Sequence, residues 1–266
     1  MLANPFYQKI QALSHTRNTS LCIGLDPDLE KIPTHFSRTM SGLQAFLEEM
    51  IEGTADLCLC YKPNISFFEG FGLEGLKLLE TLRKRIPSEI PMIIDAKRGD
   101  IGNTSAMQAR YLFDYLGADA TTLHPYMGFD SLEPFFRYQD KYHFVLALTS
   151  NPGAKDFEME PMSDGTPLYS HVIKRCLEWN NHFHNIGLVV GATHQELRKA
   201  RGQSENLLFL IPGVGAQGGD YHFATHAGKN VDNNVLVNVS RGILYAFSEK
   251  NFMAQTRALI QTKFTL

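Results

Sequence analysis

The chain has 266 residues, of which 44% are hydrophobic and 20% charged, so its composition is that of an ordinary globular protein. Its net charge of −3 and the lack of a basic run longer than residues 83–85 argue against a nucleic-acid-binding surface. Its apolar runs are far shorter than the roughly 20 residues of a membrane helix, and its first residues lack the apolar region of a signal peptide. We therefore expect a cytoplasmic protein with neither a membrane nor a nucleic-acid partner.

The cysteines agree with that location. None of the four belongs to a CxxC pair, and Cys22, Cys58 and Cys60 lie inside apolar, strand-like runs. We predict that all four, Cys176 included, are reduced residues of the core.

The chain alternates predicted strands and helices from end to end. Asn4-Pro5 indicates the start of a helix over residues 5–17, which we expect to lie across the fold as a lid. The pattern of apolar residues predicts strands at 21–25, 57–61, 91–94, 120–123, 143–148, 186–190, 207–211 and 235–239. Helical stripes lie between them, among them 41–53, 76–82 and 103–116, and a last helix includes residues 252–260.

Eight strands that alternate with helices predict a single-domain (β/α)₈ TIM barrel over residues 1–266, with the additional helix at its N-terminus. A doubly wound open sheet also alternates, but the count of eight favours a closed barrel. One connection is long, from residue 149 to residue 166, and rich in Gly, Pro and Asp. Loops of this length in a compact domain are usually functional or mobile.

Three charged residues, Asp95, Lys97 and Asp100, follow directly after the predicted strand 91–94. Positions two apart in a strand share a face, so Asp95 and Lys97 are expected to point the same way. A buried strand that runs into charges of both signs is a candidate active site. The simpler alternative is a surface loop with a salt bridge worth roughly 0–1 kcal/mol.

Polar residues also follow other predicted strands, and the active site of a barrel is built where its strands end. These residues are Asp26, Lys62, His124, Ser150 and Arg241. Taken singly, Asp26, His124 and Ser150 could also be turn or rim residues. Lysine, however, is rarely buried without a partner, so Lys62 is the strongest of the five.

A glycine-rich segment after the seventh strand matches GxGxxG at residues 213–218. A dinucleotide site is rejected because only one more strand and helix follow, and because no carboxylate ends the next strand to hold a ribose. In a barrel, the loops after strands seven and eight frequently bind phosphate. The backbone N–H groups of residues 213–219, which include Gly215 and Gln217, and of residues 240–242 are therefore predicted to hold the phosphate of a small substrate, with Arg241 as a bidentate donor.

These features together resemble the orotidine 5′-phosphate decarboxylase family. The shared pattern is a lysine that ends strand two (Lys62), the spacing Asp95-x-Lys97-x-x-Asp100, PGVGAQGG after strand seven, and an arginine after strand eight (Arg241). The sequences of residues 62–64, 95–104 and 149–154 are similar to those of the longer bacterial subgroup of the family. The resemblance implies decarboxylation of orotidine 5′-monophosphate (OMP) to UMP and CO₂, the last step of de novo pyrimidine nucleotide synthesis, without a metal or an organic cofactor.

The resemblance also implies a homodimer with shared active sites. One subunit would supply Lys62, Asp95 and Lys97, and its neighbour would supply Asp100, Ile101 and Thr104. The substrate contacts that it implies are Asp26 with Lys62 on the ribose hydroxyls, Thr104 on the ribose, Ser150 on the pyrimidine amide, and Gln217 and Arg241 on the phosphate. It assigns no role to the loop over residues 151–166 or to His124.

The chemistry implied by the resemblance depends on Lys97. Its ammonium would stabilise the carbanion left at C6 by the loss of CO₂ and would then protonate it. Asp95 and Asp100 would keep Lys97 charged and would repel the carboxylate of the substrate. Binding of the phosphate by Gln217 and Arg241 would drive the closure of a loop.

Three alternatives remain open. The metal-dependent hexulose-phosphate synthase and keto-gulonate-phosphate decarboxylase group has the same DxKxxD unit, but a carboxylate ends its second strand, so Lys62 argues against it. A Schiff-base aldolase needs a lysine of low pKa, which two adjacent aspartates oppose. A non-catalytic nucleotide-binding barrel has no sequence feature against it.

Overall fold

The computed structural model describes residues 4–191, 194–214 and 220–266. In this part of the chain, eight parallel strands form one sheet in the order β2-β1-β8-β7-β6-β5-β4-β3. Their bounds are β1 (Leu21–Gly24), β2 (Cys60–Lys62), β3 (Ile93–Arg98), β4 (Ala120–Leu123), β5 (Tyr142–Leu148), β6 (Ile186–Val190), β7 (Phe209–Ile211) and β8 (Leu236–Val239).

The two edge strands meet and close the sheet. Parallel bridges join Tyr61 to Met92 and Asn64 to Asp95. The backbone N–H of Tyr61 donates to the carbonyl of Pro91 at 3.1 Å, and that of Asp95 donates to the carbonyl of Pro63 at 2.9 Å. The predicted (β/α)₈ barrel is therefore confirmed, and the open doubly wound sheet is excluded.

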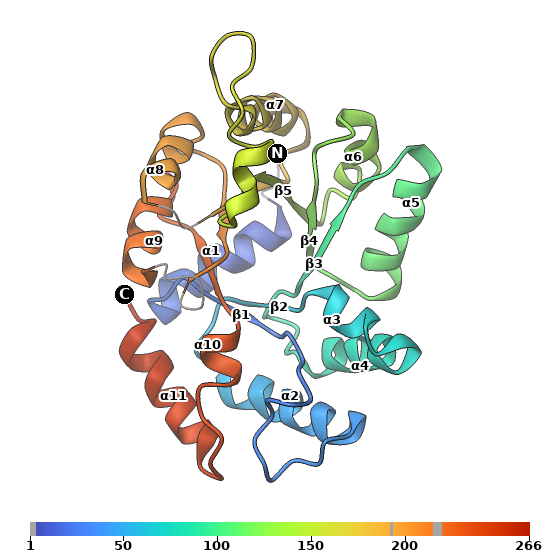
Figure 1. The fold of residues 1–266 in the computed structure, drawn as a ribbon, viewed down its shortest axis with the longest axis vertical. Coiled ribbons are helices and arrows are strands. Elements are labelled where there is room, and N and C mark those ends of the chain that lie inside the picture. The colour runs from blue at the N-terminus through green and yellow to red at the C-terminus, as the bar shows by residue number, and fades with distance from the viewer. Residues whose placement is uncertain (1–3, 192–193, 215–219) are drawn as a thin grey trace.

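Helices surround the barrel, and Figure 1 shows them as an outer ring around the strands. The α-helices are α1 (Pro5–Arg17), α2 (Met40–Thr54), α3 (Ile65–Glu69), α4 (Gly72–Arg85), α5 (Gly102–Arg110), α6 (Phe129–Phe136), α7 (Leu168–Phe183), α8 (His194–Gln203), α9 (Tyr221–Gly228), α10 (Arg241–Leu244) and α11 (Phe252–Lys263). A π-helical turn, η1 (Tyr111–Tyr115), continues α5, and a short 3₁₀ helix, η2 (Pro152–Asp156), lies in the long loop after β5.

Two predicted elements differ from the observed ones near the charged stretch. The observed strand β3 ends later than the predicted strand 91–94, because it continues through Asp95 and Lys97 to Arg98. The predicted helix 103–116 is α5 followed by the π-helical turn η1. The extension of β3 matters for the site, because it places Asp95 and Lys97 on a strand instead of on a free turn.

The interior of the barrel is apolar, and residues of α1 pack against it. Figure 1 shows α1 behind the strands, at one end of the barrel. Phe6 and Ile10 of α1 are buried against interior strand residues such as Phe144. The Asn4 side chain caps α1 by accepting from the N–H groups of Phe6 and Tyr7. Because α1 precedes β1, it covers the end opposite the loops that follow the strands, so the expected lid is a plug on the far side from the charged stretch.

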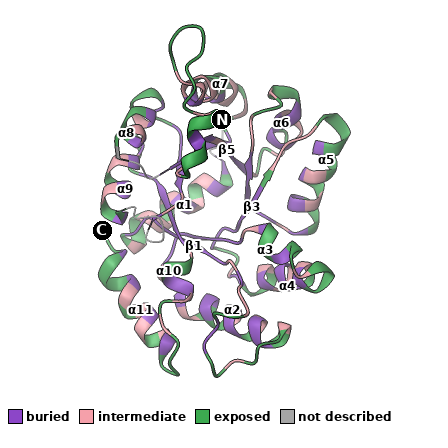
Figure 2. Cartoon of the chain, in the orientation of Figure 1, coloured by how far each residue is buried: buried purple, intermediate pink, exposed green. Residues whose placement is uncertain are grey.

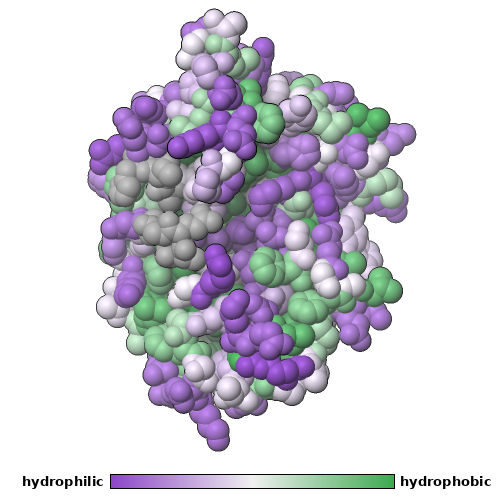
Figure 3. Space-filling model, viewed as in Figure 1, coloured by the Kyte–Doolittle hydropathy of each residue, from purple (hydrophilic) through white to green (hydrophobic). Residues whose placement is uncertain are grey.

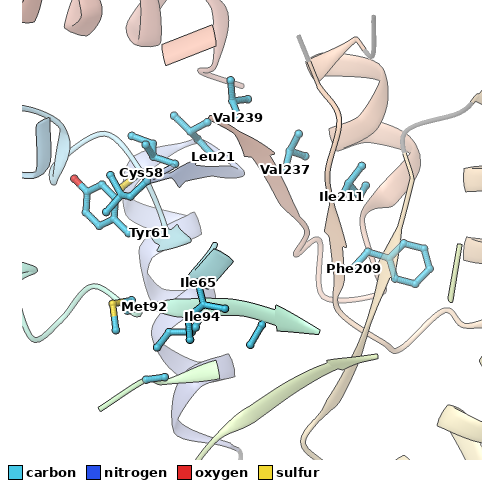
Figure 4. Packing of buried hydrophobic residues seen from close by; sticks show 14 of the residues in the cluster. Leu21, Cys58, Tyr61, Ile65, Met92, Ile94, Phe209, Ile211, Val237 and Val239 are labelled. Carbon is cyan, nitrogen blue, oxygen red and sulfur yellow. The ribbon is translucent and has the colours of Figure 1, made fainter. Parts of the chain in front are cut away.

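A second apolar layer lies between the barrel and the helices. Figure 4 shows part of it, where side chains of neighbouring strands such as Leu21, Ile211 and Val237 pack together. Burial follows the same arrangement, since Figure 2 shows the strands buried and the outer faces of the helices exposed. All four cysteines are buried and free, as predicted. Among the described helices, none has the length and apolar character needed to cross a membrane.

Candidate active site

Three charged side chains meet at the carboxyl ends of β2 and β3. The Lys62 ammonium lies 3.0 Å from Oδ2 of Asp95, and the Lys97 ammonium lies 2.7 Å from Oδ1 of the same carboxylate. We call Lys62, Asp95 and Lys97 the lysine–aspartate cluster. The predicted orientation of Asp95 and Lys97 toward one face is confirmed, and Lys62 completes the cluster from the neighbouring strand.

Thr122 on β4 holds this geometry in place. Its hydroxyl donates to Oδ1 of Asp95 at 2.8 Å and accepts from the N–H groups of Ala96 at 3.1 Å and Lys97 at 3.0 Å. The pairing of β3 with β4 shifts register between Ile94 and Arg98, and Lys97 has a φ of 44°. A lysine in the left-handed region is uncommon and costs backbone free energy, so the surrounding contacts must stabilise it.

The cluster keeps its charges although it is buried. Burial alone would raise the pKa of Asp95, but the ammonium groups of Lys62 and Lys97 and the Thr122 hydroxyl outweigh it and hold that pKa well below its usual range. Burial would also lower the pKa of Lys62, yet the carboxylates of Asp95 and Asp26 raise it above its ordinary value. The lowered pKa of Asp95 and the raised pKa of Lys62 both keep the pair ionised, as a carboxylate beside an ammonium.

The two lysines differ in access. The side chain of Lys62 is 5% exposed, whereas that of Lys97 is 47% exposed. Lys62 is thus a buried counter-ion of Asp95, and Lys97 has an ammonium that a bound molecule can reach. The sequence alone did not separate these two roles.

Asp26 links three strands beside the cluster. Its Oδ1 accepts from the N–H of Asn64 at 3.2 Å, and its Oδ2 accepts from the Ser240 hydroxyl at 2.6 Å. The Tyr245 hydroxyl donates to its carbonyl oxygen at 2.8 Å. The Asn64 amide also lies 3.4 Å from Asp95, so Asp26 is connected to the cluster through Asn64. Asn64, Ser240 and Tyr245 received no individual role from the sequence.

Asp100, Ile101 and Thr104 lie on the turn after β3 and at the start of α5. Oδ1 of Asp100 accepts from the N–H of Ile101 at 2.7 Å, and its own N–H donates to the Ser105 hydroxyl at 2.9 Å. Ile101 is 63% exposed, and Thr104 is exposed. Among the described hydrogen bonds and ion pairs, none joins Asp100, Ile101 or Thr104 to the lysine–aspartate cluster.

The remaining predicted residues lie around the rim. Ser150 is half-buried two residues after the end of β5, and Arg241 is exposed as the first residue of α10. Nε2 of His124 lies 3.0 Å from the carbonyl oxygen of Gly99, so His124 contacts the turn after β3. Gly215 and Gln217, the other predicted phosphate contacts, lie outside the described residues.

Figure 3 shows hydrophilic side chains gathered around the middle of the face viewed in Figure 1. A hollow of about 770 Å³ lies to one side, between α6, α7 and the loop after β5. Its lining includes His124 and Glu158 but none of the lysine–aspartate cluster. In the described part of the chain, no three His, Cys, Asp or Glu side chains gather closely enough to hold a metal ion. A site without a metal stays a prediction.

A closed barrel with a charged cluster at the carboxyl ends of its strands has the arrangement of a (β/α)₈ barrel enzyme. Comparison with known families narrows this class. The model of the orotidine 5′-phosphate decarboxylase / HUMPS family matches residues 19–252. The chain belongs to this family.

The family name covers two groups of enzymes, and the relatives described next carry the decarboxylase name or that of UMP synthase. An orotidine 5′-phosphate decarboxylase of Thermomicrobium roseum is 45% identical over 95% of this chain and 91% of its own length. The solved OMP decarboxylase of Leishmania donovani is 36% identical, with a TM-score of 0.83 over 97% of this chain and 98% of its own. The UMP synthase of Leishmania donovani is 37% identical, with a TM-score of 0.86, and this chain spans 56% of it.

Proposed function

We propose that the chain decarboxylates OMP to UMP and CO₂ at the lysine–aspartate cluster, with Lys97 as the proton donor. The observation that carries the proposal is the Lys97 ammonium, 47% exposed and held 2.7 Å from Asp95 at the carboxyl end of β3. The family and its decarboxylase relatives supply the reaction. The reaction is the last step in the de novo synthesis of UMP, which suits a cytoplasmic enzyme.

The chemistry follows from where charge develops. When the bond between C6 and the carboxyl carbon breaks, CO₂ leaves and the electron pair stays on C6 of the pyrimidine. A fixed ammonium beside C6 stabilises this charge and then gives C6 a proton, which water returns to the lysine. Asp95 holds the ammonium of Lys97 in place, and the buried Lys62 keeps Asp95 ionised. The residues of this chain suffice for each step, so we propose a reaction without a cofactor.

The other predicted residues are proposed to bind the substrate around this centre. Asp26, fixed by Asn64 and Ser240, would accept hydrogen bonds from the ribose hydroxyls. Ser150 would contact the pyrimidine amide. Arg241 is exposed where β8 ends, and a guanidinium there suits a phosphate. Gly215 and Gln217 would complete the phosphate site.

We also propose a homodimer in which Asp100, Ile101 and Thr104 enter the site of the partner subunit. Two observations support it. The described hydrogen bonds of Asp100 stay within its own turn, and large apolar side chains are exposed around α5 and η1 and in the loop after β4. The latter are Ile101, Met107, Tyr115, Tyr126 and Met127, at 63%, 60%, 65%, 86% and 42% exposure. Exposed apolar residues that form a patch usually mark an interface, so we propose these five as dimer contacts.

One assay tests the proposed reaction. The purified protein is mixed with OMP in the presence of EDTA, and the absorbance of the orotate ring is followed. We expect the orotate absorbance to disappear as UMP forms, at the same rate with and without the chelator. No loss of absorbance would contradict the proposal and favour the non-catalytic barrel. Loss that EDTA abolishes would favour a metal-dependent reaction.

Mixing two inactive variants tests the shared site. Lys97→Ala and Asp100→Ala homodimers should each be inactive, because each carries one defect in both sites. After subunit exchange, half of the sites in a heterodimer carry both defects and the other half carry neither, so activity should return. Subunit exchange without any recovery of activity would show that Asp100 serves its own subunit.

A further inference from the structure

We infer that Glu158, in the long loop after β5, is a positioning residue that orients the Thr149–Ser150 turn for recognition of the pyrimidine base. The inference rests on the proposed function, in which Ser150 contacts the pyrimidine amide. It gives a role to the loop over residues 151–166, to which the sequence assigned none.

The carboxylate of Glu158 binds both polar groups of Thr149. Its Oε2 accepts from the backbone N–H of Thr149 at 2.7 Å, and the Thr149 hydroxyl lies 2.9 Å from Oε2 and 3.0 Å from Oε1. Hydrogen bonds to a carboxylate are shorter and stronger than those between neutral groups. Thr149 follows the last residue of β5 and precedes Ser150, so fixing its N–H and side chain fixes the backbone that leads into Ser150.

Glu158 is itself held on a rigid element, although it lies in a loop. Its carbonyl oxygen accepts from the N–H of Tyr169 in the first turn of α7 at 2.8 Å, and the carbonyl oxygen of Glu160 accepts from the N–H of Leu168 at 3.0 Å. Tyr169 is buried, and so is Ala154, whose carbonyl oxygen accepts from the N–H of Met159 at 3.1 Å. The contacts run from α7 through Glu158 to Thr149.

Gly191 supports the turn from the other side. This residue follows β6, and its N–H donates to the carbonyl of Leu148 at 2.8 Å. A Cβ atom placed on Gly191 would lie 2.8 Å from the backbone nitrogen of Ser150 and 2.9 Å from the carbonyl carbon of Thr149. The backbone of the turn is therefore packed directly on Gly191, and the Glu158 carboxylate binds it from the loop.

The geometry shows which property of Glu158 matters. One oxygen, Oε2, is within hydrogen-bonding distance of both the N–H and the hydroxyl of Thr149. Glutamine keeps a carbonyl oxygen at that position, and its amide group can donate to the Thr149 hydroxyl. Glu158→Gln should therefore keep the turn in place, whereas Glu158→Ala should release it. Glu160→Ala is a matched control, because Glu160 is an exposed carboxylate two residues further along the same loop.

The test compares inhibition constants for two competitors of OMP turnover, UMP and ribose 5-phosphate. Both carry the ribose and the phosphate, and UMP alone carries the base. Because Glu158→Ala removes hydrogen bonds to a carboxylate, we expect it to raise the inhibition constant of UMP by about 10- to 100-fold. Ribose 5-phosphate should stay within about twofold, since its contacts lie elsewhere. For Glu158→Gln and Glu160→Ala, both constants should stay within about threefold of the wild type.

Two results would overturn the inference in an enzyme whose wild type turns over OMP. One is an equal weakening of the binding of UMP and of ribose 5-phosphate in Glu158→Ala, which would mean a general structural role. The other is unchanged binding of UMP. If Glu158→Ala does not fold, Thr149→Val tests the same contact, because it removes the hydroxyl and keeps the N–H. Thr149→Val should raise the inhibition constant of UMP by about three- to tenfold and leave that of ribose 5-phosphate unchanged. A wild type without turnover would instead refute the proposed function.

Discussion

Asp95 and His143 are both buried, titratable side chains on strands of the same sheet, yet their surroundings are opposite. Asp95, on β3, has two ammonium groups and a hydroxyl within hydrogen-bonding distance. His143, on β5, points outward among the aromatic rings of the helix layer, with ring centroids 5.5 Å from Phe113 and 5.6 Å from Phe136. In the described part of the chain, neither ring nitrogen of His143 has a hydrogen-bond partner.

The electrostatic outcome follows the surroundings. Partners of opposite charge hold the pKa of Asp95 well below its usual range, although burial opposes them. Burial lowers the pKa of His143 to about 3, and the nearby backbone of Tyr138 opposes this only in part. Asp95 therefore stays charged and His143 stays neutral at pH 7. Burial alone therefore does not decide whether a side chain of this barrel is charged, and the charged partners at the ends of the strands do.

The largest effect is expected from Asp95→Asn. The substitution removes the charge between the two lysines and leaves the buried Lys62 ammonium without its hydrogen-bonded counter-ion, so that Asp26 alone acts on it from nearby. Breaking a buried pair in this way typically costs about 3–5 kcal/mol in the free energy of unfolding, and turnover should be lost as well. Urea unfolding at pH 7 measures the cost. Asp28→Asn is the control, because Asp28 pairs with Lys31 at the surface, where such a pair is worth about 0–1 kcal/mol. A cost below about 1 kcal/mol for Asp95→Asn would remove the contrast with that surface pair.

A smaller loss in the free energy of unfolding is expected at acid pH, because of His143. Below about pH 6.5 the unfolded chain protonates this histidine, while the folded chain does not until a pKa of about 3. The unfolded state therefore binds more protons, and stability falls as the pH drops through this window. The expected loss from His143 is roughly 2 kcal/mol between about pH 7.5 and pH 5. Asp95 adds its own loss only below about pH 4, since its pKa is lowered.

The replacement His143→Phe checks that assignment, because a phenyl ring suits the aromatic surroundings and takes no proton. Its free energy of unfolding should depend less on pH between about pH 7.5 and pH 5 than that of the wild type. His15→Gln, at an exposed histidine of α1, serves as the comparison variant. An unchanged slope in His143→Phe would contradict the role of burial at this position.

The smallest of these effects is expected from Thr122→Val. This variant removes a donor to Asp95 and an acceptor for two backbone N–H groups, at a cost of about 1–2 kcal/mol. Thr122→Ser keeps the hydroxyl and should lie closer to the wild type. Thermal unfolding of the two variants side by side measures the difference. Equal melting temperatures for Ser and Val would show that the hydroxyl does not support the cluster.

The sequence predicted the barrel and the cluster because both leave periodic or terminal signals. Apolar strands alternate with helical stripes, and Lys62, Asp95 and Lys97 each come where a strand ends. Neighbouring parallel strands bring these ends together, so their proximity followed from the fold class. The extension of β3 to Arg98 was missed, because charged residues do not look like a strand until their pairing with β4 is known.

The supporting residues could not be predicted for a similar reason. Thr122 and Ser240 are hydroxyl residues in or after strands, where such residues are common. Only the register between β3 and β4 brings Thr122 to Asp95, and only the register between β8 and β1 brings Ser240 to Asp26. The contact between Glu158 and Thr149 likewise depends on a loop path that no periodicity encodes.

The variant Lys97→Ala tests the central claim most directly. Lys97 is half exposed and Lys62 still neutralises Asp95 without it, so the protein should remain folded. Turnover of OMP should fall by at least about 10⁴-fold, since the variant loses both the stabilising charge and the proton donor, while UMP still binds. A Lys97→Ala enzyme that decarboxylates OMP at a rate near that of the wild type would contradict the account.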